Sequence, residues 1–266
     1  MDKILYKYFD KADRCERNVS SSDFSKAFRE LGVKDDDTLF IHSDILSFGK
    51  IVDISTIMTS LVEEIISLSP KGNILMPAYT YSFTKNEIYD VEKTPSTVGS
   101  LTNYFRKLNQ TYRTLDPIFS ISVLGDRKFL DCDTRNCFGE RSVYSEILES
   151  KGKIVMLGSK FDKSLTFLHF IEQQFGVHYR KLKKFSGKKK VDNNIFDDYC
   201  YFYVREPRDT VKINLNNLKK YLIDKALIKS IQLGEGIISI IDSYLLYEHC
   251  TLLLRSDENF FLETGI

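Results

Sequence analysis

The sequence predicts an α/β fold, in which helices flank a central, largely parallel sheet and an α+β subdomain follows at the carboxyl end. Short apolar runs alternate with segments of helical spacing over the first two-thirds of the chain, and the pattern changes after Gly187. The chain has 266 residues and contains no repeat or low-complexity linker. We therefore expect a single domain over residues 1–266, with a core at about 20–186 and a subdomain at about 187–266.

The first half of the core supplies two buried strands around one helix. The apolar run at 38–41 predicts a strand that ends at His42, and helically spaced apolar residues predict a helix over 55–68. A second strand is expected at 73–76, since the proline after it cannot donate a ladder hydrogen bond. The aperiodic stretch from 78 to 95 then predicts a long loop, and long loops in compact domains often carry function.

The second half continues the alternation. Helices are expected at 98–108, 142–150 and 165–174, and strands at 119–124 and 153–157. Active sites of such sheets lie beyond the carboxyl ends of the strands. We therefore expect His42, the 78–97 loop and the 158–169 segment to meet at one edge of the sheet.

The carboxyl-terminal part has a different pattern. An aromatic run at 199–204 predicts a strand, and residues 215–227 predict a helix. Two further strands are expected at 235–241 and 249–254.

Composition argues against several classes of protein. The formal net charge is +1, from 38 basic and 37 acidic residues, which disfavours a nucleic-acid or anionic-membrane partner. The five cysteines form neither a CxxC pair nor a zinc-like spacing, so reduced thiols and no metal site are expected. No apolar run reaches the roughly 18 residues that span a bilayer. A cytoplasmic location is the resulting expectation.

Six ordered segments resemble the aminoglycoside 3-N-acetyltransferase family. They are TLFIHSDILSFG, GNILMPAYTYSF, KTPSTVGSLTNYFRK, RTLDPIFSISVLG, FGERSVYSEIL and GKIVMLGSKFDKSLTFLHFIEQ, in that order. The resemblance implies this family's own α/β fold, acetyl-CoA as the donor, no metal, and direct transfer of the acetyl group to an amine. The implied acceptor is an aminoglycoside or a related amino sugar.

The family's catalytic histidine lies in a motif that matches Asp162, Thr166, Leu168, His169 and Glu172. The resemblance therefore implies His169 as the catalytic base, with Asp162 and Thr166 near the acceptor. A histidine suits this role because its ordinary pKa of about 6.5 lies close to neutrality. A helix would place Glu172 on the same face as His169, where it can orient the imidazole. The residues alone also allow a packed histidine beside a solvated glutamate.

Two further segments are implied to hold acetyl-CoA. His42, Ser43 and Asp44 begin a loop that resembles the family's H-S-S-L-x-x-x-G, and backbone N–H groups there can bind the donor. In the family, the segment that corresponds to Ser96, Thr97, Gly99 and Ser100 lies near the CoA pyrophosphate. Small hydroxyl residues before a helix suit phosphate oxygens. A strand-end histidine bonded to backbone, and an ordinary helix cap, are the alternatives from the residues alone.

The acceptor is the least determined part of the prediction. Tyr79 and Glu87 belong to the 78–92 loop, which also contains two other acidic residues and is expected to contact the acceptor. Asp116 stands where the family commonly has a histidine, and no acidic residue between 216 and 224 matches the one that the family uses near its acceptor.

The basic run at 178–190 adds three interpretations. It could meet phosphates of CoA or of a nucleotide-linked sugar, contact RNA, or form a solvated surface loop. Three functions consequently stay open: acetylation of an aminoglycoside or related amino sugar, N-acylation of a nucleotide-linked amino sugar in surface polysaccharide synthesis, and a non-catalytic binding module. The oligomeric state stays open as well, a homodimer included.

Overall fold

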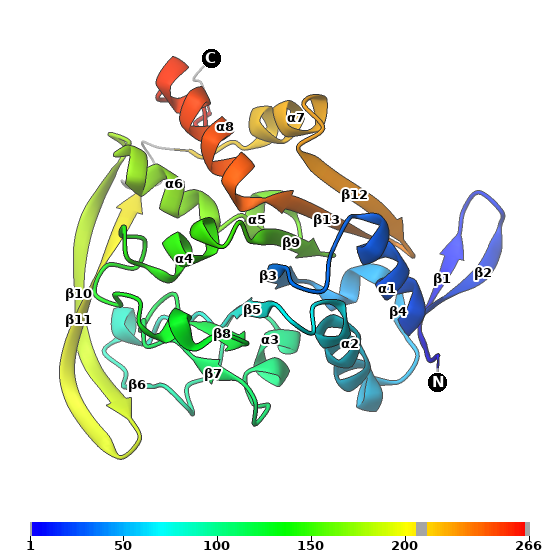
Figure 1. The fold of residues 1–266 in the computed structure, drawn as a ribbon, viewed down its shortest axis with the longest axis horizontal. Coiled ribbons are helices and arrows are strands. Elements are labelled where there is room, and N and C mark those ends of the chain that lie inside the picture. The colour runs from blue at the N-terminus through cyan, green and yellow to red at the C-terminus, as the bar shows by residue number, and fades with distance from the viewer. Residues whose placement is uncertain (1, 206–211, 264–266) are drawn as a thin grey trace.

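The computed structural model describes residues 2–205 and 212–263 (Figure 1). The strands are β1 (Ile4–Asp10), β2 (Cys15–Ser20), β3 (Thr38–Ser43), β4 (Lys50–Ile51), β5 (Asn73–Pro77), β6 (Tyr89–Asp90), β7 (Tyr112–Arg113), β8 (Ile121–Leu124), β9 (Lys153–Leu157), β10 (Arg180–Val191), β11 (Asn194–Arg205), β12 (Ile228–Leu233) and β13 (Gly236–Asp242). The helices are α1 (Ser21–Glu30), α2 (Ile54–Leu68), α3 (Ser100–Phe105), α4 (Val143–Glu149), α5 (Phe161–Ser164), α6 (Phe167–Phe175), α7 (Asn216–Asp224) and α8 (Ser243–Ser256). Single 3-10 turns lie at η1 (Ile45–Phe48), η2 (Ser82–Lys85) and η3 (Arg127–Leu130).

A seven-stranded sheet with the order β12-β13-β9-β3-β5-β8-β7 forms the centre of the molecule. Strand β3 pairs in parallel with both β9 and β5, whereas every other neighbouring pair in this sheet is antiparallel. The α/β class is confirmed. The sheet is mixed, however, and the expected parallel pairing is confined to its three central strands, because β12–β13 and β7–β8 join as antiparallel pairs at its two sides.

Apolar side chains cover both faces of the sheet, which explains the continuous apolar runs in the sequence. Successive residues of β3 alternate between the two cores: Phe40 joins the cluster under α4, α6 and α8, and Leu39 and Ile41 join the cluster under α1, α2 and α3. Figure 1 shows these two groups of helices on opposite sides of the sheet. The carboxyl ends of β3 and β9 thereby emerge between two packed layers.

The strand expected at 249–254 is wrong. These residues lie in α8, whose amino end is capped by Asp242; its carboxylate accepts N–H bonds from Tyr244 and Leu245 at 2.9 and 3.1 Å. A short apolar run has the same composition in a strand and in a buried helix, and here the preceding cap determines the outcome.

The interpretation of the basic run as a surface loop is also wrong. Residues 180–191 form β10, which pairs along its full length with β11 in a long antiparallel hairpin. Acidic residues neutralise its end, since Lys188 pairs with Asp197, Lys189 with Asp198 and Lys190 with Asp90. The boundary expected near residue 187, between the core and the carboxyl-terminal subdomain, falls inside this strand. Strands β12 and β13, which follow later in the chain, extend the main sheet.

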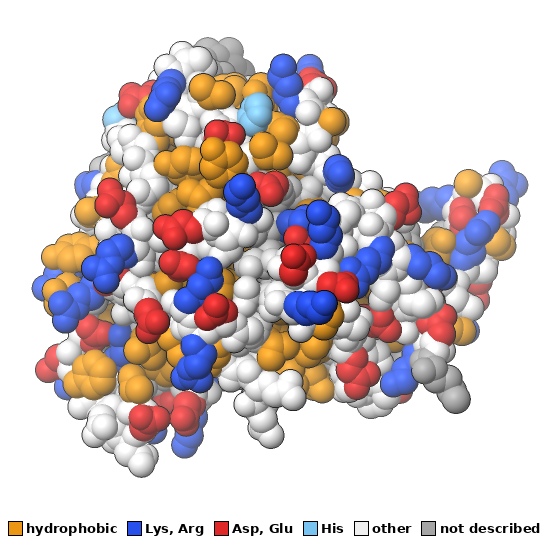
Figure 2. All heavy atoms as spheres, in the orientation of Figure 1, with side chains coloured by type: hydrophobic (Ala, Val, Ile, Leu, Met, Phe, Trp, Pro, Cys, Tyr) orange, Lys and Arg blue, Asp and Glu red, His pale blue; other side chains and the backbone are white. Residues whose placement is uncertain are grey.

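The distribution of surface charges and the state of the cysteines agree with what the composition predicted. Lys and Arg side chains are interspersed with Asp and Glu on the face that Figure 2 shows. All five cysteines are free. Within the described ranges, no helix combines the length and apolar character needed to cross a membrane.

Candidate active site

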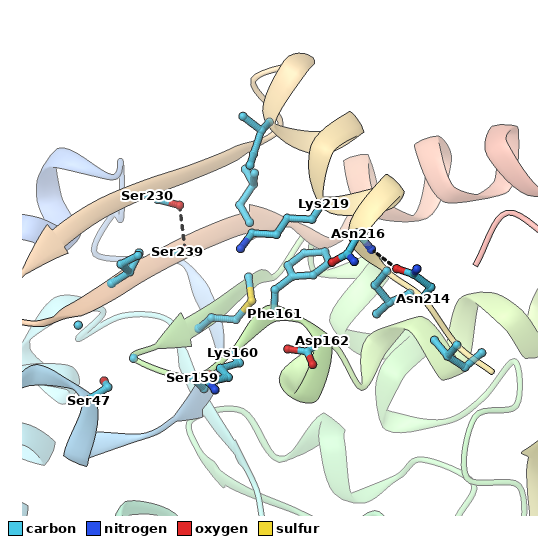
Figure 3. A pocket seen from close by; sticks show the side chains of 18 of the residues that line it. Ser47, Ser159, Lys160, Phe161, Asp162, Asn214, Asn216, Lys219, Ser230 and Ser239 are labelled. Atoms are coloured by element: carbon cyan, nitrogen blue, oxygen red, sulfur yellow. Dashed lines mark hydrogen bonds between the residues drawn. The ribbon is translucent and has the colours of Figure 1, made fainter. Parts of the chain in front are cut away.

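Three adjoining cavities lie beyond the carboxyl ends of β3 and β9. An outer cavity of about 770 Å³ (Figure 3) shares Asp162, Ile213 and Leu215 with a middle cavity of about 350 Å³. The middle cavity in turn shares Lys163, Thr166, His169 and Phe202 with an inner cavity of about 290 Å³. His169 therefore stands where the middle and inner cavities meet, and two reactants could approach it from different sides.

His169 is held by its own helix. It lies in the first turn of α6, and its Nδ1 is 3.3 Å from Oε2 of Glu172, three residues later. The imidazole side chain is 32% exposed, whereas the glutamate is fully buried. The two residues thus share a helix face, as the sequence predicted, and the alternative of a solvated glutamate is wrong.

Glu172 has two further partners, both from the start of the β10 segment. The Arg180 guanidinium lies 2.9 Å from Oε2, and the Tyr179 hydroxyl donates to Oε1 at 3.0 Å. Burial by itself raises the pKa of Glu172, but the His169 contact and the Arg180 charge outweigh it, so the net pKa lies below the usual value. The carboxylate is consequently ionised at neutral pH.

An ionised Glu172 fixes the tautomer of His169. Since the carboxylate can only accept, Nδ1 carries the proton and Nε2 keeps its lone pair. Burial lowers the pKa of His169; the Glu172 contact opposes this shift, and the positive charges of Arg180 and Arg205 add to it. The net pKa falls below 6.5, so the ring is neutral at pH 7 and can accept a proton.

Aromatic side chains surround the exposed part of the imidazole. The rings of Phe119, Phe138 and Phe202 have centroids 6.4, 5.5 and 6.0 Å from that of His169. Phe119 and Phe202 also line the inner cavity. This apolar wall limits the access of water to the histidine and explains part of its lowered pKa.

His42 occupies the same inner cavity in a different setting. It is 6% exposed near the end of β3, its ring meets that of Phe40 at 4.7 Å, and its Nε2 is buried without a hydrogen-bond partner in the described part of the chain. Burial lowers the pKa of His42 to about 3. Ser43 and Tyr79 line the same cavity, and the Tyr79 hydroxyl lies 2.7 Å from that of Tyr144.

The segment around residues 96–100 lies beside this cavity but is bonded within the protein. Thr97 donates its N–H to the Tyr79 carbonyl at 2.9 Å, and the Asn103 amide bonds both Ser96 and Gly99. Gly99 caps α3 with a φ of 141°, a left-handed backbone that favours glycine, and Ser100 begins the helix. Among these residues only Val98 lines the inner cavity.

Of the four other candidate residues, two line a cavity together with His169 and two do not. Asp162 and Thr166 line the middle cavity beside His169. Asp44 is exposed and caps the η1 turn, where its carboxylate accepts the Leu46 N–H at 3.2 Å. Glu87 lies in a separate depression with Lys188 and Asp197, so the structure does not bring it to His169.

A family model described as aminoglycoside 3-N-acetyltransferase matches residues 40–255. The chain belongs to this family. Membership places the protein among the N-acetyltransferases. No curated protein matches the chain.

Solved structures of low sequence identity share the fold. The apoenzyme of aminoglycoside acetyltransferase AAC(3)-IVa is 20% identical, with 92% of each chain covered and a TM-score of 0.74. AAC-IIIb in its binary complex with CoASH is 16% identical over 92% of this chain and 98% of that one, with a TM-score of 0.76. The YokD protein from Bacillus subtilis is 17% identical over 90% and 94% of the two chains, with a TM-score of 0.75.

Asp116, which departs from the family pattern, has a structural role in this acetyltransferase. Its carboxylate is buried and accepts the N–H groups of Ile118 and Phe119 at 2.8 and 2.7 Å. Burial raises the pKa of Asp116 despite these bonds. The turn that it closes carries Phe119 toward His169.

Sequence reasoning missed several residues of the candidate active site, including two that hold Glu172 and two of the rings around His169. Arg180 and Tyr179 belong to the basic run, for which the sequence suggests a phosphate or RNA contact or a surface loop. Phe138 begins the family-like segment FGERSVYSEIL but no role is predicted for it, and Phe202 belongs to none of the six family-like segments. One signal was available: the aromatic run at 199–204 was an expected strand, and alternate residues of a strand face one side. Nothing in the sequence placed that side against α6.

Proposed function

We propose that the protein transfers the acetyl group of acetyl-CoA to an amine of an aminoglycoside or related amino sugar, with His169 as the base. One observation carries the proposal. His169 is a neutral imidazole oriented by a buried, ionised Glu172, and it stands at the junction of two cavities. The assignment agrees with the family to which the chain belongs.

The reaction needs a base because an ammonium has no lone pair with which to attack a thioester. His169 Nε2 takes one proton from the ammonium and passes it to solvent, which leaves a neutral amine, and it takes a second proton as the amine nitrogen forms its bond to the thioester carbonyl carbon. The C–S bond then breaks, and the CoA thiolate leaves and receives the proton that the imidazolium holds. Positioned bases of this kind contribute on the order of 10² to 10⁴ in rate.

Glu172 supports this proton transfer in two ways. It holds the ring in the tautomer with a free Nε2, and its negative charge stabilises the imidazolium that forms during the reaction. Arg180 and Tyr179 hold the carboxylate in place. Glu172 is therefore a positioning residue, whereas His169 contacts the reacting atoms.

The two cavities suggest a division between donor and acceptor. We place the acetyl thioester in the inner cavity, beside His42 and Ser43, with the segment Ser96–Ser100 nearby. The acceptor amine would enter through the middle cavity, past Asp162 and Thr166, and Asp162 would attract the ammonium form. AAC-IIIb with CoASH and AAC-VIa with sisomicin are precedents of this fold for both kinds of ligand.

A thiol-release assay tests the proposal. Purified protein is mixed with acetyl-CoA and a panel of amines that includes aminoglycosides, simple amino sugars and nucleotide-linked amino sugars. We expect amine-dependent release of free CoA together with an N-acetylated product identified by mass spectrometry. If no amine in the panel accelerates release above hydrolysis, the proposal is wrong and a non-catalytic binding module takes its place.

A further inference from the structure

The outer cavity is larger than a simple amine requires, and its lining combines charged, polar and apolar side chains. Its 770 Å³ lies in the upper part of the roughly 300–1,000 Å³ typical of sites for drug-sized ligands. It is enclosed by α5, the beginning of α7 and the β12–β13 hairpin, and Figure 3 shows Phe161 and neighbouring polar side chains facing the same space. Because it shares Asp162 with the middle cavity, a long acceptor could extend from His169 into it.

Two lysines that line this cavity make no ion pair in the described part of the chain. Lys219 extends from α7 into the space above Phe161, and Lys160 lies on the α5 side (Figure 3). Neither amino group has an ion-pair partner within residues 2–205 and 212–263, whereas Lys153 of the neighbouring strand pairs with Asp37 at 2.5 Å. Two unpaired ammonium groups repel a polycation and attract an anion.

The carboxylates of the cavity are distributed unevenly around the two lysines. Asp162 stands at the junction with the middle cavity, toward His169. Glu263 is already paired with Lys212 at 3.7 Å. Glu235 belongs to the turn between β12 and β13, at the end of the hairpin away from α7. The cavity therefore offers a negative group toward His169 and two positive groups beyond it.

We infer that the acceptor is an amino sugar that carries a phosphate ester. The inference rests on the proposed acetyl transfer. The ammonium end passes Asp162 to reach His169, and the phosphate lies in the outer cavity between Lys160 and Lys219. Lysine is a natural partner of phosphate as a compact point charge.

Neutral polar groups complete a surface suited to this ligand. Asn214 and Asn216 line the cavity and supply amide donors, and Phe161 supplies an apolar face, whereas the Ser159 hydroxyl, which also lines the cavity, donates to the His42 carbonyl at 3.2 Å. A polycationic aminoglycoside would leave both lysines facing like charge. A sugar phosphate or nucleotide-linked sugar satisfies them.

Binding can be measured without turnover, which separates this inference from the proposed function. Isothermal titration compares glucosamine, glucosamine 1-phosphate, UDP-glucosamine, gentamicin and acetyl-CoA on the wild-type protein, on Lys219→Ala and on the double variant with Lys160→Ala. Lys220→Ala is the matched control, because Lys220 is an exposed neighbour on α7 that does not line the cavity. Thermal unfolding verifies that each variant is folded.

We expect the two phosphate-bearing sugars to bind more tightly than glucosamine and gentamicin. Loss of Lys219 should weaken their binding by about tenfold or more, the effect of losing one hydrogen bond to a charged group, and the double variant should abolish the preference. Lys220→Ala should bind as the wild type does.

Two results would overturn the inference. One is equal or tighter binding of glucosamine or gentamicin to the wild-type protein. The other is a double variant that loses affinity for acetyl-CoA while its affinity for the sugar phosphates is unchanged, since the lysines would then hold the donor's phosphates. Acetylation of amines without any preference for phosphate would leave the proposed transfer intact and refute only this inference.

Discussion

Two histidines line the same inner cavity, and burial lowers the pKa of both, but only one of them contacts a carboxylate in the described part of the chain. His169 is one-third exposed and bonded to an ionised glutamate; burial lowers its pKa, and the glutamate opposes this shift. His42 is almost fully buried beside Phe40 and has no acidic partner among the described residues, so burial lowers its pKa to about 3. Two rings in one cavity thus differ in whether a counter-charge stabilises the protonated form, and only His169 has one among the described residues.

The largest expected effect distinguishes the two rings directly. His169→Ala should lower kcat by about 10² to 10⁴, because it removes the base. His42→Ala should chiefly raise KM for acetyl-CoA, since His42 lines the cavity assigned to the donor but does not exchange a proton near neutral pH. Steady-state kinetics on both variants provide the measurement.

A third histidine serves as the control for these variants. His178 lies 3.3 Å from Glu258, the same separation as in the active-site pair, but both side chains are about half exposed. His178→Ala should retain wild-type kinetics. A larger loss of kcat in His42→Ala than in His169→Ala would reverse the assignment.

The second effect concerns the counter-charge itself. Glu172→Gln leaves Arg180, whose side chain is 4% exposed, buried without its ion-pair partner. Breaking such a pair costs about 3–5 kcal/mol of unfolding free energy, and kcat should fall because the imidazolium loses its stabilising charge. Chemical denaturation and kinetics measure the two effects.

Glu258→Gln is the matched change on the exposed pair. Its unfolding free energy should stay within about 0.5 kcal/mol of the wild type. Equal stability of Glu172→Gln and the wild type would show that the buried network does not exist as described.

The smallest effect appears only in acid and concerns His42. Its folded pKa of about 3 lies below the unfolded value of about 6.5, so between these pH values the unfolded chain binds the additional proton. Its contribution to stability is therefore complete above about pH 6.5 and decreases as the pH falls toward 3. Replacement by a residue that does not titrate removes this dependence.

His42→Leu provides the measurement. Relative to wild type, its unfolding free energy should improve by up to about 1.4 kcal/mol for each pH unit below 6.5. Denaturation curves at pH 7, 5.5 and 4.5 determine the difference. A constant difference across this range would mean that His42 is accessible to protons in the folded state.

The sequence predicted the central strands and the helical pairing of the active site because these features are local. The apolar runs at 38–41, 73–76 and 153–157 fall in β3, β5 and β9, and three-residue spacing placed Glu172 beside His169. Such patterns depend on periods of two and 3.6 residues, which a single sequence displays.

The features that escaped prediction depend on contacts between distant segments. Arg180, at the start of β10, contacts Glu172 in α6. Phe202 lies beside His169 because of the register in which β11 pairs with β10. The lysines of β10 looked available for phosphate, although Asp90, Asp197 and Asp198 neutralise its far end. Local patterns contain no information on such partners.

The pH dependence of kcat/KM in wild type and Glu172→Gln, measured with one acceptor, tests the central role of His169 most directly. The acceptor amine titrates identically with both enzymes, so a displacement of the acid limb isolates the enzyme's base. Glu172 raises the pKa of His169 against burial, so its neutralisation should move the acid limb to lower pH and lower the plateau. Superimposable acid limbs would contradict the assignment of His169 as a base tuned by Glu172.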